Sequence, residues 1–418
     1  MPFQSILSLL VVLAVIALLL GIDYYAFTGI RNLMSSATPL WRRVAYIAYG
    51  LTSLVALSGF VGLLLFFSTR NWDWYHTATG LFGWTLTFFV TKLVLVALLL
   101  GYDLLNGGWS LVQQVQGEAV PASLSRRKFV AQVGLSVASL PFAGMVYGMI
   151  KGKYAYRIHR LTLRSKDLPA AFHGFTLAQI SDIHSGSFDD HAAVERGVQM
   201  LVREQPDLIV FTGDLVNELA EEIKPWLDTF GKMDAPFGKF STLGNHDYAT
   251  HVSLDEAAYQ RNMQQLFRYH EQMGFRLLNN ENVRLEKDGQ HLSLIGVENW
   301  GEPPFPQKGD LDLALRGTEE APFRILLSHD PTHFDHKVLP HPLPVHLTLS
   351  GHTHGMQFGV ETAGIKWSPV KYRYPRWAGL YEEAGQWLYV NRGFGFIGFP
   401  GRVGIWPEIT LITLEREA

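Results

Sequence analysis

Three long stretches of the chain carry no charged residue, and this feature limits the possible folds more than any other. The stretches are Met1–Ile22, Val44–Thr69 and Phe129–Ile150. A fourth stretch, Gly80–Leu105, is equally apolar apart from Lys92 and Asp103. A helix needs about 20 apolar residues to cross the hydrocarbon core of a bilayer. The sequence therefore predicts an N-terminal bundle of four transmembrane helices.

The rest of the chain has the composition of a soluble domain that is long enough to bury a full core. We therefore expect two domains, a membrane domain over residues 1–150 and a soluble domain over residues 151–418. The formal net charge is −3 and there is no basic tail, so nothing indicates nucleic acid as a partner. The absence of cysteine excludes disulfides, thiolate metal ligands and cysteine nucleophiles.

Basic residues in the short connections predict the orientation of the four spans. The first connection holds Arg31, Arg42 and Arg43, the second only Arg70, and the third Arg126, Arg127 and Lys128. Connections rich in Lys and Arg stay in the cytoplasm, so four spans place the soluble domain on the extracytoplasmic face of the inner membrane. Basic residues that closely follow the last span, from Lys151 to Arg164, argue against this orientation.

The last span follows a short basic segment, Ser125–Val130, with the sequence SRRKFV. This segment resembles a twin-arginine export signal that stands inside the chain instead of at its start. An ordinary basic flank of a span accounts for the same residues, and the sequence leaves both interpretations open.

Lys92 lies near the middle of its predicted span, where an ammonium group must find a partner or reach water. Asp23 and Asp103 are the candidate partners, although both lie nearer to span ends. We expect a structural ion pair inside the bundle, with a transport or sensing role as the alternative.

Apolar runs of the soluble domain are followed by side chains that bind metal ions. The runs, each with the residues that follow it, are 175–180 with Asp182 and His184, 207–211 with Asp214, 240–243 with Asn245, His246 and Asp247, 323–327 with His329, and 345–349 with His352 and His354. Helical patterns over 190–204, 219–233 and 253–273 separate the first four runs. Alternating strands and helices indicate an α/β fold, in which ligands gather at strand ends. The pattern predicts a metal site there.

The candidate ligands are carboxylates, imidazoles and one amide, without sulfur. Such a set suits manganese, iron, zinc or magnesium, and the sequence does not choose between them. Seven potential ligands exceed what one ion normally takes from a protein, so we expect two ions that share a bridging ligand. Two metal ions about 3.5–4 Å apart form the clamp that hydrolyses phosphoesters by in-line displacement.

These motifs, in this order, resemble those of the calcineurin-like metallophosphoesterase superfamily. The match runs from Phe175 to the C-terminal end and includes GNHD, LLSHDP and GHTHG. These last three are similar to the membrane-anchored bacterial branch, with its twin-arginine-exported phosphoesterases and UDP-2,3-diacylglucosamine pyrophosphatase-like members. The four-span start is similar to that of transmembrane proteins with a metallophosphoesterase domain. Met356 departs from the branch, which often has a glycine there.

The resemblance implies an α/β/β/α sandwich with a dinuclear metal site at its strand ends, loaded with manganese, iron or zinc. It assigns Asp182, His184 and His354 to the first metal ion, Asn245, His329 and His352 to the second, and Asp214 to the bridge between them. It also makes His246 the residue that faces the substrate, where it protonates the leaving oxygen or stabilises charge on the phosphoryl group. Asp247 would orient His246 by a hydrogen bond, with a simple turn cap as the alternative.

The expected function is that of a membrane-anchored phosphoesterase that cleaves a phosphate ester or a pyrophosphate bond. The anchor favours the bilayer as a partner and a phosphorylated small molecule or lipid of the cell envelope as the substrate. One alternative is a UDP-2,3-diacylglucosamine pyrophosphatase of lipid A synthesis, although such substrates are handled in the cytoplasm. Two further alternatives are a non-catalytic membrane sensor that binds metal and a transporter with a regulatory domain. Lys92 is the only residue that supports the transporter.

One further segment, Lys371–Trp377, alternates cationic and aromatic residues in the sequence KYRYPRW. Such a segment is able to meet anionic head groups or the phosphate of the substrate. A solvated loop is the alternative interpretation.

Overall fold

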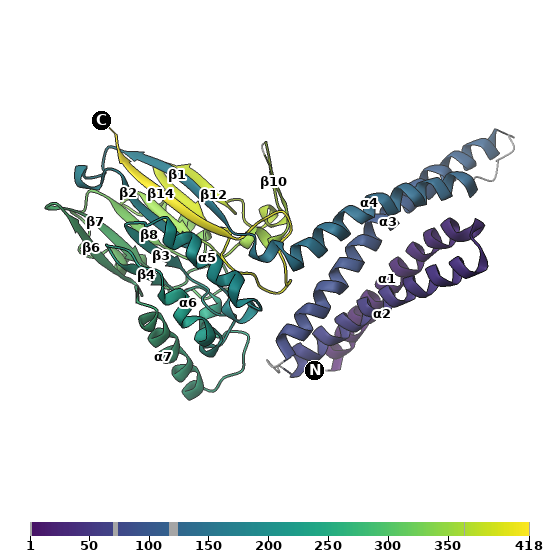
Figure 1. Ribbon diagram of the computed structural model, residues 1–418, viewed down its shortest axis with the longest axis horizontal. Coiled ribbons are helices and arrows are strands. Elements are labelled where there is room, and N and C mark those ends of the chain that lie inside the picture. Colours follow the sequence, from purple (N-terminus) through teal and green to yellow (C-terminus); the bar gives the residue numbers. More distant parts are fainter. Residues whose placement is uncertain (1, 70–73, 117–123, 363, 418) are drawn as a thin grey trace. The chain divides into compact units, whose positions relative to one another are not determined.

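The computed structural model describes residues 2–69, 74–116, 124–362 and 364–417 (Figure 1). The chain divides into two compact units, Met1–Tyr147 and Gly148–Ala418. Each unit has its own architecture and is described by itself.

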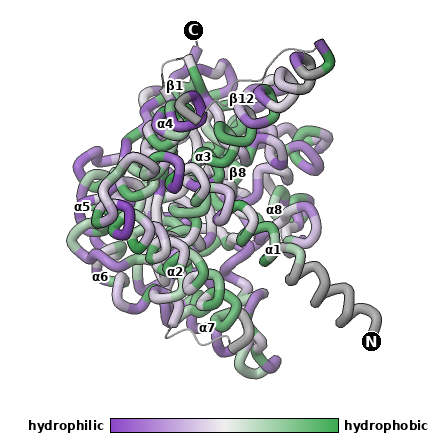
Figure 2. Tube along the Cα trace, turned by 90° about the vertical axis from the view of Figure 1, so that its right-hand side faces the viewer, coloured by the Kyte–Doolittle hydropathy of each residue, from purple (hydrophilic) through white to green (hydrophobic). Residues whose placement is uncertain are grey.

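The first unit consists of long apolar helices. They are α1 (Pro2–Leu33), α2 (Pro39–Thr69), α3 (Tyr75–Val115) and α4, which runs from Leu124 to Ile150. Among the described residues, three helical segments are long and apolar enough to cross a membrane, namely Pro39–Phe66, Tyr75–Ser110 and Arg126–Ile150. The first predicted span, Met1–Ile22, falls in α1, where the side chains before Ala14 lie outside the described ones. The described part of α1 is mainly apolar (Figure 2).

A buried ion pair ties α1, α2 and α3 together. Lys92 of α3 is 8% exposed, and its Nζ lies 2.5 Å from Asp23 Oδ1 of α1 and 2.8 Å from Ser53 Oγ of α2. The same ammonium group stands 4.4 Å from the centre of the Tyr49 ring. Of the two candidate partners, Asp23 is therefore the one that Lys92 contacts. Asp103 instead pairs with Arg127, at 2.8 Å.

The second unit contains two six-stranded sheets. In spatial order, the first sheet holds β1 (Arg157–Ser165), β14 (Glu408–Arg416), β2 (Phe175–Ile180), β3 (Leu208–Thr212), β4 (Lys239–Thr242) and β5 (Phe275–Leu277). The second sheet holds β12 (Gly379–Glu383), β13 (Gln386–Val390), β9 (Leu347–Ser350), β8 (Arg324–Leu327), β7 (Gln290–Gly296) and β6 (Glu281–Lys287). Strands β2 to β5 are parallel, as are β7, β8, β9 and β13.

The two sheets pack face to face, because apolar side chains from both of them form one buried cluster. This cluster includes Phe175, Leu177 and Val210 of the first sheet and Leu294, Ile325, Leu327 and Leu349 of the second. Strand β3, with the sequence LIVFT, is buried along its whole length, as strands covered on both sides are.

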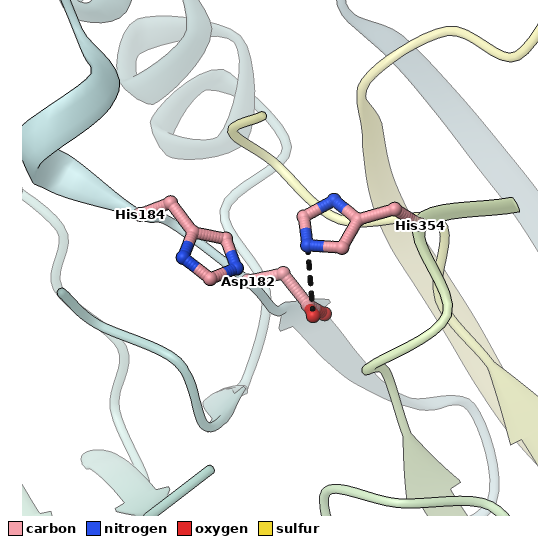
Figure 3. A group of neighbouring side chains, drawn as sticks. All are labelled: Asp182, His184 and His354. Atoms are coloured by element: carbon pink, nitrogen blue, oxygen red, sulfur yellow. Dashed lines mark ion pairs between the residues drawn. The ribbon is translucent and has the colours of Figure 1, made fainter. Parts of the chain in front are cut away.

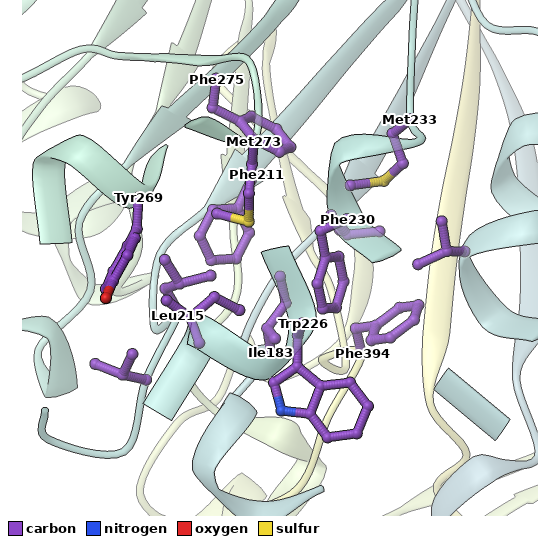
Figure 4. Close-up of a cluster of buried hydrophobic side chains, with 14 of the residues drawn as sticks. Ile183, Phe211, Leu215, Trp226, Phe230, Met233, Tyr269, Met273, Phe275 and Phe394 are labelled. Atoms are coloured by element: carbon purple, nitrogen blue, oxygen red, sulfur yellow. The ribbon is translucent and has the colours of Figure 1, made fainter. Parts of the chain in front are cut away.

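Helices cover the outer face of each sheet, which gives the unit an α/β/β/α arrangement. The first sheet is covered by α5 (His191–Arg203), α6 (Leu227–Gly231) and α7 (Glu256–Gln272), and Figure 4 shows side chains of this layer, among them Phe211, Phe230 and Trp226. The second sheet is covered by α8 (Leu311–Leu315) and a π-helical turn, Phe334–Val338.

Most predicted elements match the structure, with one correction among the helices. Strand 175–180 is β2, and helix 190–204 is α5, where the Asp190 side chain accepts a hydrogen bond from the Ala193 N–H group as an N-cap. The helix predicted over 219–233 is instead a 3₁₀-helix, Ala220–Trp226, followed by the short α6. Pro225 lies inside this segment, and its missing N–H group interrupts an α-helical hydrogen-bond pattern.

Candidate metal centre

Carboxyl ends of parallel strands from both sheets meet at one place. Asp182 follows β2 and Asp214 follows β3 in the first sheet, while His329 follows β8 and His352 follows β9 in the second. Backbone hydrogen bonds fix these ends to one another: the Asp182 N–H group donates to Gly213 O at 2.9 Å, and the Gly351 N–H group donates to His329 O at 2.9 Å. Four strand ends therefore present their polar side chains to a common volume.

Candidate ligands adopt an unusual backbone conformation. The φ angles of Asp182, His184, Asp214, His352 and His354 are 52°, 47°, 60°, 71° and 50°. Non-glycine residues rarely occupy this left-handed region, and such strain gathers at functional sites where the surrounding structure enforces it. The strained backbone of these residues directs their side chains toward the interior of the site.

Two glycines allow the strand ends to approach each other. Gly213 has a φ of 90°, which a residue with a side chain rarely adopts. A Cβ atom at Gly351 would collide with Ser181 Oγ and with Asp182 Oδ2. The glycines that precede Asp214 and His352 are therefore required by the geometry of the site.

The first side-chain cluster contains Asp182, His184 and His354, and Figure 3 shows the two rings on either side of the carboxylate. One ligand atom from each residue lies within 4.8 Å of those of the other two. His354 Nε2 is 3.3 Å from Asp182 Oδ1. All three residues are buried. The structure thus brings together the three residues that were assigned to the first metal ion.

The second cluster contains Asp214, His329 and His352. His329 Nε2 lies 3.2 Å from Asp214 Oδ2, and His352 Nδ1 lies 2.8 Å from Asn245 Oδ1. The same oxygen of Asp214, Oδ2, is also 3.4 Å from His184 Nε2 in the first cluster. Asp214 therefore stands between the two clusters, where a bridging ligand would stand.

Unpartnered polar atoms test whether these clusters fit metal ions. Both ring nitrogens of His184 and the Nε2 atom of His354 are buried without a hydrogen-bond partner among the described residues. A buried polar atom without a partner costs about 1–3 kcal/mol. A divalent cation would occupy the lone pairs of these rings and neutralise the neighbouring carboxylates, so the donor set fits such an ion.

Electrostatic interactions inside the centre are strong. Burial lowers the pKa of His329. The charge of Asp214, the hydrogen bond to Asp214 and the charge of Asp182 outweigh burial and raise this pKa to about 10. Burial also lowers the pKa of His184 and of His354, and it brings that of His352 to about 4. Neutral imidazole is the form that binds metal. Three of the four histidines are therefore neutral and able to bind a metal ion, while His329 carries a proton that the ion must displace.

His246 lies beside the two clusters and belongs to neither. Its Nδ1 atom lies 2.8 Å from Asn217 O and 3.6 Å from Glu218 Oε1, and its ring centre is 5.0 Å from that of His184. Burial lowers the pKa of His246, but the negative charges of Asp214 and Glu218 outweigh burial and raise it to about 9. A protonated imidazole next to the candidate metal ligands is suited to donate a proton.

The structure corrects the predicted role of Asp247. Its carboxylate accepts hydrogen bonds from the backbone N–H groups of Asp214 and Leu215, both at 2.9 Å, and from that of Gly244 at 2.8 Å. The described partners of the His246 ring are Asn217 and Glu218 instead. Asp247 therefore corresponds to the turn cap, which was the alternative, and it holds the loop that carries the bridging candidate.

Sequence reasoning missed four residues around the centre. The Tyr374 hydroxyl lies 2.8 Å from His352 Nε2, and Asp330 Oδ2 lies 3.4 Å from the same nitrogen. Near His246, Glu218 contacts both that ring and His251. The position of Asp330 directly after His329 was a usable signal, and Tyr374 belongs to the segment KYRYPRW that had been singled out. Glu218 and His251 have no such signal.

Comparison with protein families gives two matches. Residues 175–356 match the family described as calcineurin-like phosphoesterase. Residues 6–153 match the 4TM phosphoesterase family, which is described as a transmembrane domain of calcineurin-like phosphoesterases. The two matches fall on the metal centre and on the apolar helices, respectively.

Several curated proteins are similar to the chain. It is 30% identical to the uncharacterized metallophosphoesterase YkuE of Bacillus subtilis over 70% of this chain and 98% of that protein. It is 28% identical to a transmembrane protein with metallophosphoesterase domain of Danio rerio, over 72% of this chain and 65% of that protein. A third similar protein is the UDP-2,3-diacylglucosamine pyrophosphatase LpxG of Chlamydia trachomatis, 29% identical over 56% of this chain and 83% of that protein.

Proposed function

The chain belongs to the calcineurin-like phosphoesterase family, and from this premise we propose that it is a dinuclear phosphoesterase that acts on an envelope- or lipid-linked substrate. Its membership makes it a metal-dependent phosphoester hydrolase with a transmembrane region. One observation carries the proposal of two ions: Asp214 approaches His184 of one cluster and His329 of the other. A single ion would leave one of these clusters without its cation.

Each residue of the centre has a proposed task. Asp182, His184 and His354 would hold one ion, and Asn245, His329 and His352 the other, with Asp214 between them. Ions of manganese, iron or zinc in these places would supply an activated water and neutralise the phosphoryl oxygens. The chain itself supplies the geometry, since strained backbone and close glycines hold the ligands in place before any ion binds.

His246 is proposed to protonate the leaving oxygen. Asn217 O accepts the Nδ1–H hydrogen bond, which leaves Nε2 as the nitrogen that carries the transferable proton. In the metal-free protein the pKa of the ring is about 9, so the ring is charged near neutral pH and has a proton to give. Glu218 stabilises the charged ring from the side of Nδ1.

The purified full chain, loaded with metal, tests the proposal. Elemental analysis should find close to two ions per chain, and a screen should detect hydrolysis among phosphomonoesters, phosphodiesters and nucleotide-sugar pyrophosphates. Full activity with the content held at one ion would contradict the dinuclear centre. Bound metal without hydrolysis of any class would favour the non-catalytic sensor.

A second candidate function has its own support. The name of the Chlamydia trachomatis relative supports a UDP-2,3-diacylglucosamine pyrophosphatase activity for this chain as well. Such a substrate contains a pyrophosphate bond, and it would require the catalytic unit on the cytoplasmic side. The nucleotide-sugar arm of the screen separates this candidate from a phosphomonoesterase.

We place the catalytic unit on the extracytoplasmic face of the inner membrane. The support is the excess of basic residues in the first and third connections, three in each against one in the second. Protease added to intact spheroplasts should cleave the catalytic unit while a cytoplasmic control protein survives. Protection until lysis would reverse the orientation and strengthen the pyrophosphatase candidate.

A further inference from the structure

A two-stranded hairpin lies between the metal centre and the KYRYPRW segment. It consists of β10 (Val360–Thr362) and β11 (Ile365–Trp367), which are antiparallel and belong to neither six-stranded sheet. In Figure 1, β10 stands away from the two sheets. Sequence reasoning did not predict this hairpin.

The polarity of the hairpin is reversed relative to an ordinary surface hairpin. Val360 pairs with Trp367 and Thr362 with Ile365, so these four side chains share one face. On this face, Val360 is 45% exposed, Ile365 58% and Trp367 41%. The apolar face is thus the one that is left open, whereas a hairpin at a protein surface normally buries it.

The opposite face of the hairpin is polar, and its side chains are bound to the rest of the domain. Glu361 accepts hydrogen bonds from the guanidinium group of Arg392, one of them at 2.8 Å from Nε, and Arg392 is bound in turn by the buried Glu408 of β14. Lys366 donates to the carbonyl oxygen of Ala378 and lies 5.2 Å from the centre of the Trp377 ring. These contacts fix the hairpin with its apolar face outward, so the exposure of that face is built into the fold.

Two further residues close to the hairpin in the chain are also exposed. Met356 precedes the hairpin and is 56% exposed, and Tyr372 follows it and is 77% exposed. The Lys371 ammonium group stands 5.3 Å from the centre of the Tyr372 ring and is itself at the surface. We call the side chains of Met356, Val360, Ile365, Trp367 and Tyr372 the apolar rim.

We propose that the apolar rim is a docking surface for the lipid bilayer, which it enters at the level of the head groups. Tryptophan and tyrosine favour this interface, and a cation beside them is attracted by anionic lipids. The chain also carries its own bilayer attachment, since only residues 151–156 connect α4 to β1. A bilayer is therefore within reach of every copy of this domain, whereas a protein partner or a second copy has to be recruited.

The apolar rim is joined to the metal centre at both of its ends. Met356 follows the candidate ligand His354 by two residues, and Tyr374, two residues after Tyr372, contacts His352 Nε2 at 2.8 Å. A rim docked on lipid would hold the centre at the membrane surface. This link between the rim and catalysis rests on the proposed function. It favours a phosphate ester of a lipid as the substrate.

Site-directed spin labelling tests the docking surface without any need for activity. The chain contains no cysteine, so Ile365→Cys gives a single labelling site, and Gln264→Cys on the exposed side of α7 gives a matched control. The full chain is reconstituted in bilayers of phosphatidylethanolamine and phosphatidylglycerol. The nitroxide at residue 365 should be accessible to oxygen and protected from an aqueous nickel chelate, while the nitroxide at residue 264 should be open to the chelate.

Equal accessibility of both labels to the chelate would overturn the proposal. Dipolar broadening between labels at residue 365 would also overturn it, because a second copy of the chain would then cover the rim. Bilayers of phosphatidylcholine alone provide the charge control: weaker protection there supports the contribution of Lys371 and of anionic lipid.

Kinetics test the connection to the catalytic centre separately. Ile365→Glu should lower the ratio of phosphatidate hydrolysis in vesicles to glycerol phosphate hydrolysis in solution by about tenfold, whereas Gln264→Glu should leave it at the wild-type value. An unchanged ratio in Ile365→Glu would overturn the link between the rim and the substrate. A chain that hydrolyses neither compound would count against the proposed phosphomonoesterase activity, and the spin-label result would still decide the docking surface.

Discussion

Buried polar clusters occur in both units, and they differ in how their charges are balanced. Around Lys92 in the helical unit, one cation meets one carboxylate at 2.5 Å and a hydroxyl at 2.8 Å, so the cluster is complete by itself. In the metal centre, carboxylates and imidazoles crowd together, and nitrogens of His184 and His354 have no hydrogen-bond partner among the described residues. A complete cluster stabilises the fold, whereas an incomplete one requires a cation from outside.

Removing the carboxylate between the two clusters should have the largest effect. We expect Asp214→Ala to empty both sites and to lower kcat/KM by more than the factor of about 10²–10⁴ that a general acid contributes. Elemental analysis and steady-state kinetics of the full chain measure the two effects. Asp312→Ala removes an exposed acid and is the control. Retention of both ions in Asp214→Ala would remove the basis for its bridging position.

His246→Ala should lower kcat by about 10²–10⁴, while metal content stays near that of the wild type. The reason is that His246 contacts Asn217 and Glu218 and belongs to neither ligand cluster. A substrate with a very acidic leaving group needs little protonation, so it should lose much less rate. Loss of metal in this variant would show that His246 is a ligand.

Breaking the complete cluster should change stability and leave chemistry alone. Asp23→Leu leaves Lys92 without its carboxylate, and a lone lysine deep in a bilayer costs about 2.5–3.5 kcal/mol. We expect a lower thermal midpoint for the helical unit and a wild-type rate on a soluble phosphomonoester. The double variant Asp23→Leu with Lys92→Leu should recover most of the stability. If the double variant is no more stable than Asp23→Leu alone, the ion pair itself stabilises the helical unit, and the loss in Asp23→Leu is not simply the cost of an isolated lysine.

The last prediction concerns the pH dependence of metal uptake, an effect that is small for each single pH unit. The pKa of His329 is raised to about 10 in the metal-free protein, so the ring holds a proton that the ion must displace. Metal affinity should therefore rise with pH up to about 10, by at most about tenfold per pH unit for this one group. Chelator competition at several pH values measures it. An affinity independent of pH over this range would contradict the protonated state of His329.

Much of the candidate site was predictable because parallel strands bring their carboxyl ends together. Once 175–180 and 207–211 were recognised as parallel strands of one sheet, Asp182 and Asp214 had to lie near one another, whereas His352 approaches them from the second sheet. The roles of Glu218 and Tyr374 were not predictable, because these residues reach the centre from loops. Asp247 illustrates the same limit: its carboxylate has several backbone N–H groups within reach, and the sequence does not say which partner it takes.

The fold was predictable where apolar residues repeat and less so elsewhere. Strands β2, β3 and β8 are mainly apolar, which identifies them. Strands β1 and β6 alternate with charged residues at exposed edges of their sheets, so they resemble loops in composition. The hairpin of β10 and β11 was missed for a further reason, since its apolar residues face outward.

The place of β14 in the first sheet has a consequence for biosynthesis. This strand, residues 408–416, lies between β1 and β2, which precede it by more than two hundred residues. The sheet therefore cannot close while the ribosome still holds Glu408–Arg416, and β1 and β2 must wait with unpaired edges until then. Such late closure makes folding slow and leaves the nascent chain open to aggregation. Synthesis of β14, and not that of β1 and β2, is therefore the event that permits this sheet to close.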